Sequence, residues 1–181
     1  MTTTLIIRRE SPGDADAVRR VHDAAFPPGD GTSTGESRLV DDLRPSASWI
    51  PALSIVAETP DEGVVGHVLA TRGALVPTDG TTSIPALGVA PVGVVPAHQH
   101  LRIGSSLLYA LIGAAQAMDE PLLCLLGNPA YYSRFGFVLA ARHGVLPPVP
   151  GWAPHFQALV LDAARVRPGT FHYAAEFDEL G

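Results

Sequence analysis

The residues best suited to chemistry gather in one segment of this chain, Val92 to Leu108. The members that suit an anion site are, in order, Gln99, Arg102, Gly104 and Ser105. Pro96 has no N–H and a fixed φ angle, so it ends a strand, and apolar residues at helical spacing follow Gly104. The segment therefore predicts a strand, a sharp turn and a helix start. Unpaired N–H groups at a helix start, together with the helix dipole, bind anions.

A second segment, Gly127 to Phe137, places two tyrosines before a Phe-Gly-Phe triplet. A phenol is protonated at neutral pH and can act as a proton donor. Taken alone, tyrosines beside Phe135 and Phe137 are better explained as aromatic core.

Together the two segments resemble the GNAT superfamily of N-acetyltransferases, in its small bacterial type with a Tyr-Tyr-x-x-Phe-Gly-Phe segment. The spacing Val94-x-Pro-x-x-Gln99-x-x-Arg102-x-Gly104 is similar to that family's acetyl-CoA signature, Gln/Arg-x-x-Gly-x-Gly/Ala. Arg102 stands where the family has its first glycine. Glycine lets the backbone approach a phosphate, so a side chain there can block the cofactor, whereas an arginine can also bind phosphate oxygens itself. We favour retained binding.

The resemblance implies acetyl-CoA as co-substrate. It assigns pairing with the pantetheine arm to backbone groups of Val92 and Val94. It assigns the pyrophosphate, chiefly through main-chain N–H groups, to Gln99, Arg102, Ile103, Gly104 and Ser105.

The same resemblance implies direct acetyl transfer to a primary amine in a ternary complex, with Tyr132 as the general acid and Tyr131 pointing elsewhere. Asn128 either bonds the cofactor or a backbone group, or simply forms the turn before Pro129. The acceptor is expected to be a small-molecule or peptide amine.

No general base can be assigned, because the predicted strand Ala86 to Val94 has no acidic residue. His67 and Glu36 can face the acceptor cleft, but a lone strand histidine is commonly structural, and Glu36 has capping-box spacing from Ser33. A water chain, or an amine that arrives neutral, remains an equal alternative. His98 and His100 lack a third ligand, so no metal is expected.

Two readings from other classes compete with an enzyme. A catalytically weak acyl-CoA-binding or regulatory module is favoured by Arg102 and by the missing acidic residue. An interaction protein that keeps the fold without a cofactor gains support only if Arg102 occludes the turn.

Length and composition exclude several other classes of protein. The 181 residues suit a single domain, 1–181, and the formal charge of −6 argues against a non-specific nucleic-acid binder. No apolar run is long enough to span a bilayer and the N-terminal apolar stretch is too short for a signal peptide, so a cytoplasmic protein that does not bind membranes is expected. The one cysteine, Cys124, lies in an apolar run and suits core packing. Edge strands near the C-terminus can pair with a second copy of the chain, so a homodimer is possible.

Periodicity and turn residues predict an α/β (α+β) fold with the order β-α-α-β-β-β-α-β-α-β-β, which matches a GNAT-like mixed, mostly antiparallel sheet flanked by helices. The predicted strands are Leu5–Arg9, Leu53–Glu58, Val64–Val76, Ala86–Val94, Leu122–Leu126, Phe137–Ala140 and, as the last, Phe156–Leu161. The predicted helices start after Ser11, near Glu36, at Gly104 and at Ala130. Residues 27–34 and the proline-rich residues 144–154 are predicted loops.

Overall fold

The computed structural model describes residues 4–27 and 35–180. Its strands are β1 (Ile6–Arg9), β2 (Ser54–Thr59), β3 (Gly63–Pro77), β4 (Ile84–Val94), β5 (Leu122–Leu126), β6 (Val138–Leu139), β7 (Val145–Leu146), β8 (Phe156–Val160) and β9 (Gly169–His172). Its α-helices are α1 (Ala15–Ala25), α2 (Gly35–Leu43), α3 (Ile103–Ala117) and α4 (Pro129–Tyr132). The predicted order of elements is therefore found, with β7 and β9 added to it.

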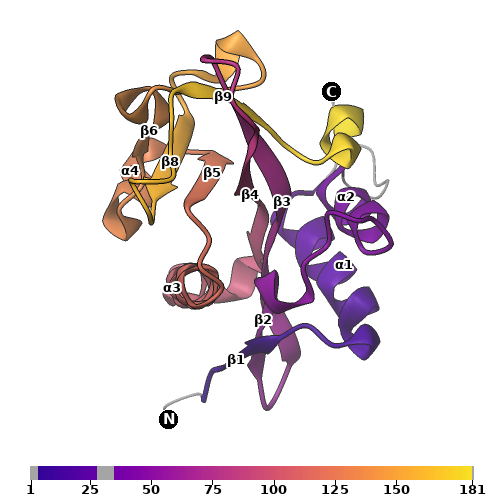
Figure 1. The fold of residues 1–181 in the computed structure, drawn as a ribbon. Coiled ribbons are helices and arrows are strands. Elements are labelled where there is room, and N and C mark those ends of the chain that lie inside the picture. The colour runs from indigo at the N-terminus through magenta and orange to yellow at the C-terminus, as the bar shows by residue number, and fades with distance from the viewer. Residues whose placement is uncertain (1–3, 28–34, 181) are drawn as a thin grey trace.

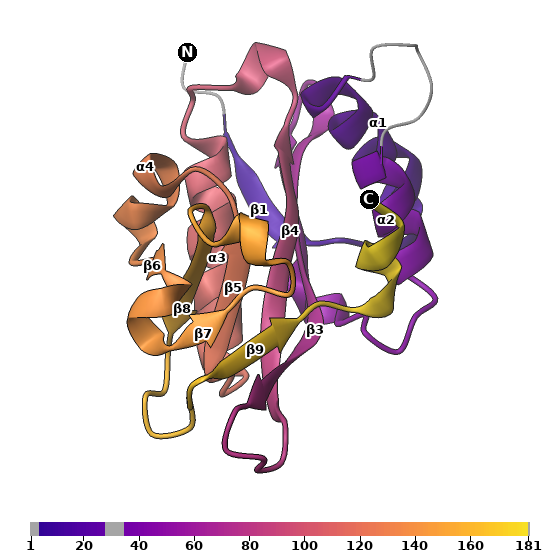
Figure 2. The same ribbon diagram turned by 90° about the horizontal axis from the view of Figure 1, so that it is seen from above.

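The strands form one mixed sheet in the described part of the chain, in the order β1-β2-β3-β4-β5-β8-β6. Most neighbours are antiparallel, and the β4–β5 and β7–β9 pairs are parallel. Helix α3 lies on one side of β3 and β4, while α1 and α2 lie on the other (Figures 1 and 2). The expected GNAT-like architecture, an open and mostly antiparallel sheet flanked by helices, is confirmed.

Apolar residues at helical spacing explain how the helices pack. Helix α3 buries Leu107, Leu108 and Leu111 completely against the sheet. It lies close to β3 because Gly66 has no side chain: a methyl group there would be 3.1 Å from both Ile103 and Leu107. On the opposite face, α1 and α2 share a core with β2, β3 and the C-terminal segment.

The interpretation of Phe156–Leu161 as the last strand is wrong. β9 follows it and pairs antiparallel with the end of β3. β9 also pairs parallel with β7, a strand that lies within the predicted proline-rich loop. Both strands are short, and their pairing with segments far away in the sequence gives them no local signal. Beyond β9, the 3₁₀ helix Ala175–Leu180 lies beside α2 (Figure 1).

Some expectations fall outside the described residues, namely the loop through Thr34 and the Ser33 cap of α2. Cys124 is buried as a free thiol in β5, as predicted. Among the described residues, none of the helices has both the length and the apolar character that a bilayer span requires.

Candidate active site

The central feature of the site is an opening between β4 and β5. These parallel strands pair only at Leu87↔Leu123 and Gly88↔Cys124. Beyond Gly88, β4 continues to Val94 alongside β3 alone. A bulge adds one residue to β4, because Val89 and Val92 lie opposite Ala70 and Val68. The edge of β4 that faces β5 is therefore left unpaired over the second half of the strand.

Backbone direction determines which groups this open edge offers. The N–H of Val95 donates to the Val65 carbonyl of β3 at 3.0 Å. Because main-chain groups of successive strand residues point to opposite edges, those of Val94 and Val92 point into the opening. The Gln99 side-chain amide donates to the Val94 carbonyl at 3.1 Å, which leaves the Val94 N–H and both polar groups of Val92 facing the gap.

The turn after β4 carries two left-handed residues and then starts α3. His100 and Arg102 have φ angles of 65° and 63°. The N–H groups of His98 and Gln99 already donate within the turn, to Val95 and Pro96. The first helical donor bonded in the turn of α3 is the N–H of Ser106, which donates to the Arg102 carbonyl at 3.0 Å.

The N–H groups before Ser106, on Ile103, Gly104 and Ser105, thus belong to the open first turn of α3. Gln99 differs from them, since both its backbone and its side-chain donors hold the turn together. The helix start therefore presents three consecutive N–H groups beside an exposed guanidinium, a combination that suits a phosphate.

A cavity of about 610 Å³ lies in front of this turn. Its lining brings together most of the predicted cofactor residues and adds side chains from the tyrosine segment: Val94, His98, Gln99, His100, Arg102, Ile103, Gly104, Ser105, Tyr131 and Arg134. Arg134 was not predicted. Its guanidinium stacks over the Tyr131 ring, 4.7 Å from the centroid, and gives the cavity a second cation besides Arg102.

The two tyrosines point to different places. A methyl group placed on Gly104 would lie 2.9 Å from the Tyr131 hydroxyl, so Tyr131 reaches over the helix start. Tyr132 instead packs its ring on Gly127, where a methyl group would lie 2.4 Å from the ring, just beyond the end of β5. Tyr132 therefore lies at the β5 side of the opening.

The environment of Tyr132 keeps its phenol protonated. Burial, and then the neighbouring Tyr131, raise its pKa from 10.0 to about 12. Asn128, in the same segment, accepts a hydrogen bond from the Ala130 N–H at 2.9 Å and caps α4. Its turn-forming role is thus visible in the structure.

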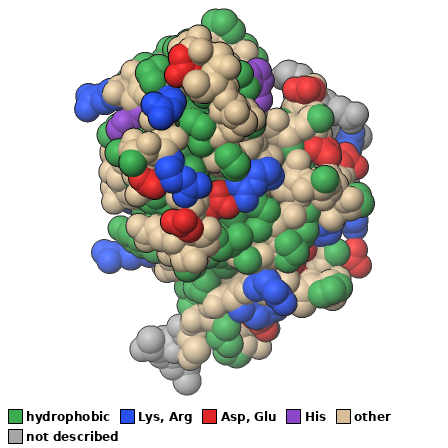
Figure 3. All heavy atoms as spheres, viewed as in Figure 1, with side chains coloured by type: hydrophobic (Ala, Val, Ile, Leu, Met, Phe, Trp, Pro, Cys, Tyr) green, Lys and Arg blue, Asp and Glu red, His purple; other side chains and the backbone are tan. Residues whose placement is uncertain are grey.

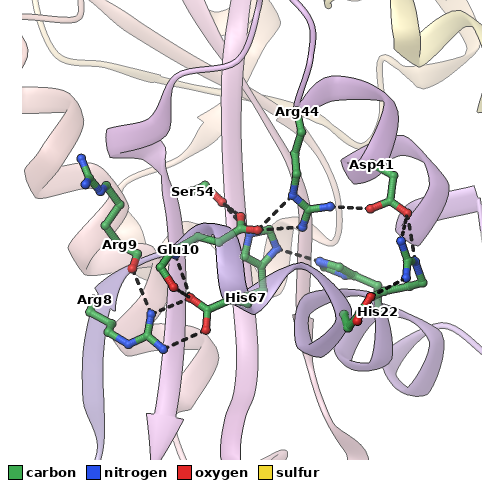
Figure 4. Close-up of polar contacts among 12 residues, drawn as sticks. Arg8, Arg9, Glu10, His22, Asp41, Arg44, Ser54 and His67 are labelled. Atoms are coloured by element: carbon green, nitrogen blue, oxygen red, sulfur yellow. Dashed lines mark hydrogen bonds and ion pairs between the residues drawn. The ribbon is translucent and has the colours of Figure 1, made fainter.

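The candidates for the base have very different surroundings. His67 is fully buried on β3, and Glu36 is partly exposed on α2. Figure 4 places His67 in a chain of polar groups with Ser54, Glu10 and His22. Sequence reasoning missed these three partners, because they come from β2, from the loop after β1 and from α1.

Charge is mixed on the face of the molecule in Figure 3. The arginines, drawn in blue, stand apart there, with acidic and apolar side chains between them. Nε2 of His98 lies 3.2 Å from a Glu62 oxygen. In residues 4–27 and 35–180, no group of three or more His, Cys, Asp or Glu side chains is arranged to hold a metal ion.

Comparison with known proteins places this geometry in a family. Residues 6–140 match the model of the acetyltransferase (GNAT) domain. The chain is 32% identical over 180 residues to the uncharacterized N-acetyltransferase YhbS of Escherichia coli strain K12, covering 97% of this chain and 100% of that protein.

Two solved structures share the fold. That of YhbS from Escherichia coli in complex with CoA superposes with a TM-score of 0.86 at 28% identity, covering 100% of this chain and 96% of the other. That of a GNAT family acetyltransferase from Brucella melitensis in complex with acetyl-CoA has a TM-score of 0.77 at 31% identity, covering 97% and 99%. The chain therefore belongs to the GNAT family of N-acetyltransferases and is an acyltransferase.

Proposed function

We propose that this protein transfers the acetyl group of acetyl-CoA directly to a primary amine within a ternary complex. The observation that carries the proposal is the unpaired edge of β4 at Val92 and Val94, which leads to the cavity at the start of α3. Such an edge can bind an extended amide-containing arm as an added strand. The two similar structures hold CoA and acetyl-CoA, which supports the same co-substrate here.

The cofactor-binding residues of this proposal act in two groups. Val92 and Val94 pair with the pantetheine arm through their backbones. Pyrophosphate is held by the N–H groups of Ile103, Gly104 and Ser105, with the guanidinium of Arg102 beside them. Gln99 fixes the turn, and Asn128 starts the helix that carries Tyr132.

Tyr132 acts as the general acid of the reaction. Attack of the amine on the thioester carbonyl forms the C–N bond and breaks the C–S bond, and the thiolate takes the phenolic proton. A pKa near 12 keeps that proton in place at neutral pH, and backbone donors at the opening stabilise the oxyanion. The acceptor is a small-molecule or peptide amine, and residues 1–181 act as a single, cytoplasmic domain. A homodimer stays a prediction.

Calorimetric titration with acetyl-CoA tests the cofactor proposal, with dephospho-CoA for comparison. We expect micromolar binding of acetyl-CoA, and weaker binding of dephospho-CoA if the cations of the cavity contact the terminal phosphate. The absence of any binding would refute the proposal. A screen of primary amines by thiol release then identifies acceptors, with little background because Cys124 is the only thiol and is buried.

A catalytically weak acyl-CoA-binding module is the second candidate, favoured by one observation: β4 carries no acidic side chain. Tyr132→Phe separates the two. In an enzyme, loss of the acid lowers kcat by about 100-fold or more while acetyl-CoA binding persists. In a binding module, the low turnover of the wild type stays unchanged.

A further inference from the structure

We propose that His22 takes the proton from the acceptor amine, and that His67, Ser54 and Glu10 orient its ring. This inference rests on the proposed function, because it names the base of that same reaction. It assigns a role to a buried polar chain that acetyl-CoA binding does not need, on the α1 and α2 side of the sheet (Figure 4).

The chain runs through four elements with bonding distances at each step. The Ser54 hydroxyl makes a short hydrogen bond to a Glu10 oxygen and lies 2.9 Å from Nε2 of His67. Nδ1 of His67 lies 2.8 Å from Nε2 of His22. Both imidazoles and Ser54 are completely buried.

The direction of each hydrogen bond follows from the carboxylate at the end of the chain. Burial raises the pKa of Glu10, but hydrogen bonds from His67, Ser54 and Arg44 outweigh it and lower the pKa from 4.5 to about 2, so Glu10 is ionised. An ionised carboxylate only accepts, so Ser54 donates to it. Nε2 of His67 must then carry its hydrogen, because it lies 2.9 Å from the Ser54 oxygen and 3.5 Å from a Glu10 oxygen. The other nitrogen of His67 must then accept, and it receives Nε2–H of His22.

This order leaves Nδ1 of His22 without a hydrogen and with its lone pair unused. That atom is buried and has no hydrogen-bond partner among the described residues. A buried polar atom without a partner is unfavourable, and such atoms in native proteins commonly meet a ligand or water. The bond that Nδ1 lacks is the one that an ammonium hydrogen, or a water held by it, would make.

His22 is aimed at β4, at the strand segment that the proposed function places beside the thioester. A methyl group on Gly93 would lie 2.8 Å from Nδ1, so the ring sits directly on this part of the strand. Tyr173 covers β4 in the same way at Gly88, from the C-terminal segment that packs with α1 and α2. Between them lie Ala90 and Pro91. In this proposal the amine approaches this segment from the α1 side, while the thioester enters from the cavity at the start of α3.

The charged and titratable groups around His22 suit a neutral base. Burial, then His67 and Arg44, lower its pKa, and Glu10 opposes this effect. The elements that face it thus contribute His67 from β3, Glu10 from the loop after β1 and Arg44 from the end of α2, while β4 contributes Gly93. Once protonated, His22 is stabilised through His67 by the Glu10 carboxylate.

The protons balance in this scheme. An N–H bond of the ammonium breaks and its proton binds Nδ1 of His22, so that the neutral amine can attack. After the C–N bond forms, the second nitrogen proton replaces the one that Tyr132 gives to the CoA sulfur. His22 finally releases its proton to solvent, and the products are the amide and CoA.

Histidine-ring NMR on the ¹⁵N-labelled wild type tests the chain without any reaction. We expect His22 and His67 both as neutral Nε2–H tautomers at pH 7. Glu10→Gln should alter the ring shifts of both, whereas His172→Gln, at an exposed position of β9, should alter neither. An Nδ1–H tautomer at His22 would overturn the proposal whatever the enzyme does.

Kinetics with two probes test the base role. Benzylamine is cationic at pH 7 and needs a base, whereas hydroxylamine is neutral. His22→Gln should lower kcat with benzylamine about 100-fold and with hydroxylamine only a few-fold, at unchanged acetyl-CoA affinity. Glu10→Gln keeps the side-chain shape but removes the charge that stabilises protonated His22. It should therefore move the acid limb of the pH profile of kcat with benzylamine to lower pH. Equal losses with both amines and an unmoved limb would make the chain structural and refute the proposal.

The two failures are distinguishable. If the wild type binds acetyl-CoA and neither amine is acetylated, the proposed function fails and the base role with it. If both amines are acetylated and His22→Gln turns over benzylamine as the wild type does, only the base role fails. The assay is free of lysine self-acetylation, since all basic residues other than histidine are arginine.

Discussion

Replacing Arg102 by glycine should make the protein more stable and lower its affinity for CoA. Arg102 has a φ angle of 63°, in the left-handed region that costs a non-glycine residue about 1–2 kcal/mol. Glycine removes that strain but loses about 0.5–1 kcal/mol through the greater freedom of the unfolded chain. The side chain is exposed, so little packing is lost.

The net gain is about 0.5–1 kcal/mol, which corresponds to a Tm about 1–4 °C higher for a chain of this size. CoA binding should respond in the opposite direction. Loss of a charged hydrogen bond to phosphate costs about 1.5–3 kcal/mol, so the dissociation constant should rise about 10- to 100-fold.

Thermal unfolding and calorimetry on the same preparations measure both effects. His100→Gly is the control for strain, because its φ angle of 65° predicts a similar rise in Tm without loss of a guanidinium. Arg102→Lys is the control for charge, and it should keep most of the affinity with no gain in Tm. A lower Tm in Arg102→Gly would refute the strain argument. Tighter CoA binding would show that the arginine blocks the turn.

Three further predictions follow from the site. Gly127→Ala should lower kcat about tenfold or more, because its methyl group would lie 2.4 Å from the Tyr132 ring, whereas Gly113→Ala, with open space around it in α3, should leave kcat unchanged and raise Tm slightly. The rate should not fall on the alkaline side up to pH 10, because the pKa of Tyr132 is raised to about 12, and a limb near pH 8 in the kcat profile would argue against this acid. The pKa of Glu10 is about 2 in the folded protein against 4.5, so its carboxylate stabilises the fold above pH 4.5, and the protein loses roughly 3 kcal/mol of stability as the pH falls to 2. In denaturant unfolding, the free energy of unfolding should depend less steeply on pH in Glu10→Gln than in the wild type. Equal slopes would contradict the lowered pKa.

Local patterns were sufficient to predict most of the fold. The apolar spacing after Gly104 gave helix α3, and the apolar run Leu122–Leu126 flanked by proline and glycine gave β5 with its observed bounds. β9 escaped prediction because its four residues carry little alternation, and its place is set by pairing with β3 nearly a hundred residues earlier. Long-range pairing of this kind leaves no trace in the segment itself.

One part of the candidate site could likewise be predicted from a local motif, and another part could not. The cofactor turn has a local motif, and its predicted residues Arg102, Ile103, Gly104 and Ser105 line one cavity. The polar chain has no motif, because His22 meets His67 across 45 positions and Ser54 across the sheet. His67 could be singled out by residue type, but its partners depend on how α1 packs on β3. Backbone angles, such as that of Arg102, are likewise visible only in the folded chain.

The opening between β4 and β5 also bears on how this protein can change over generations. In the proposed function, recognition there depends on main-chain N–H and C=O groups, which every residue except proline supplies in full. Substitutions along that edge that keep the strand extended leave those groups in place. The sequences of the cofactor part and of the acceptor part of the proposed site can therefore change at different rates. Under that proposal, the part that holds the cofactor can be inherited almost unchanged, while the side chains proposed to meet the amine, on the α1 side of the sheet, remain free to change with new acceptors.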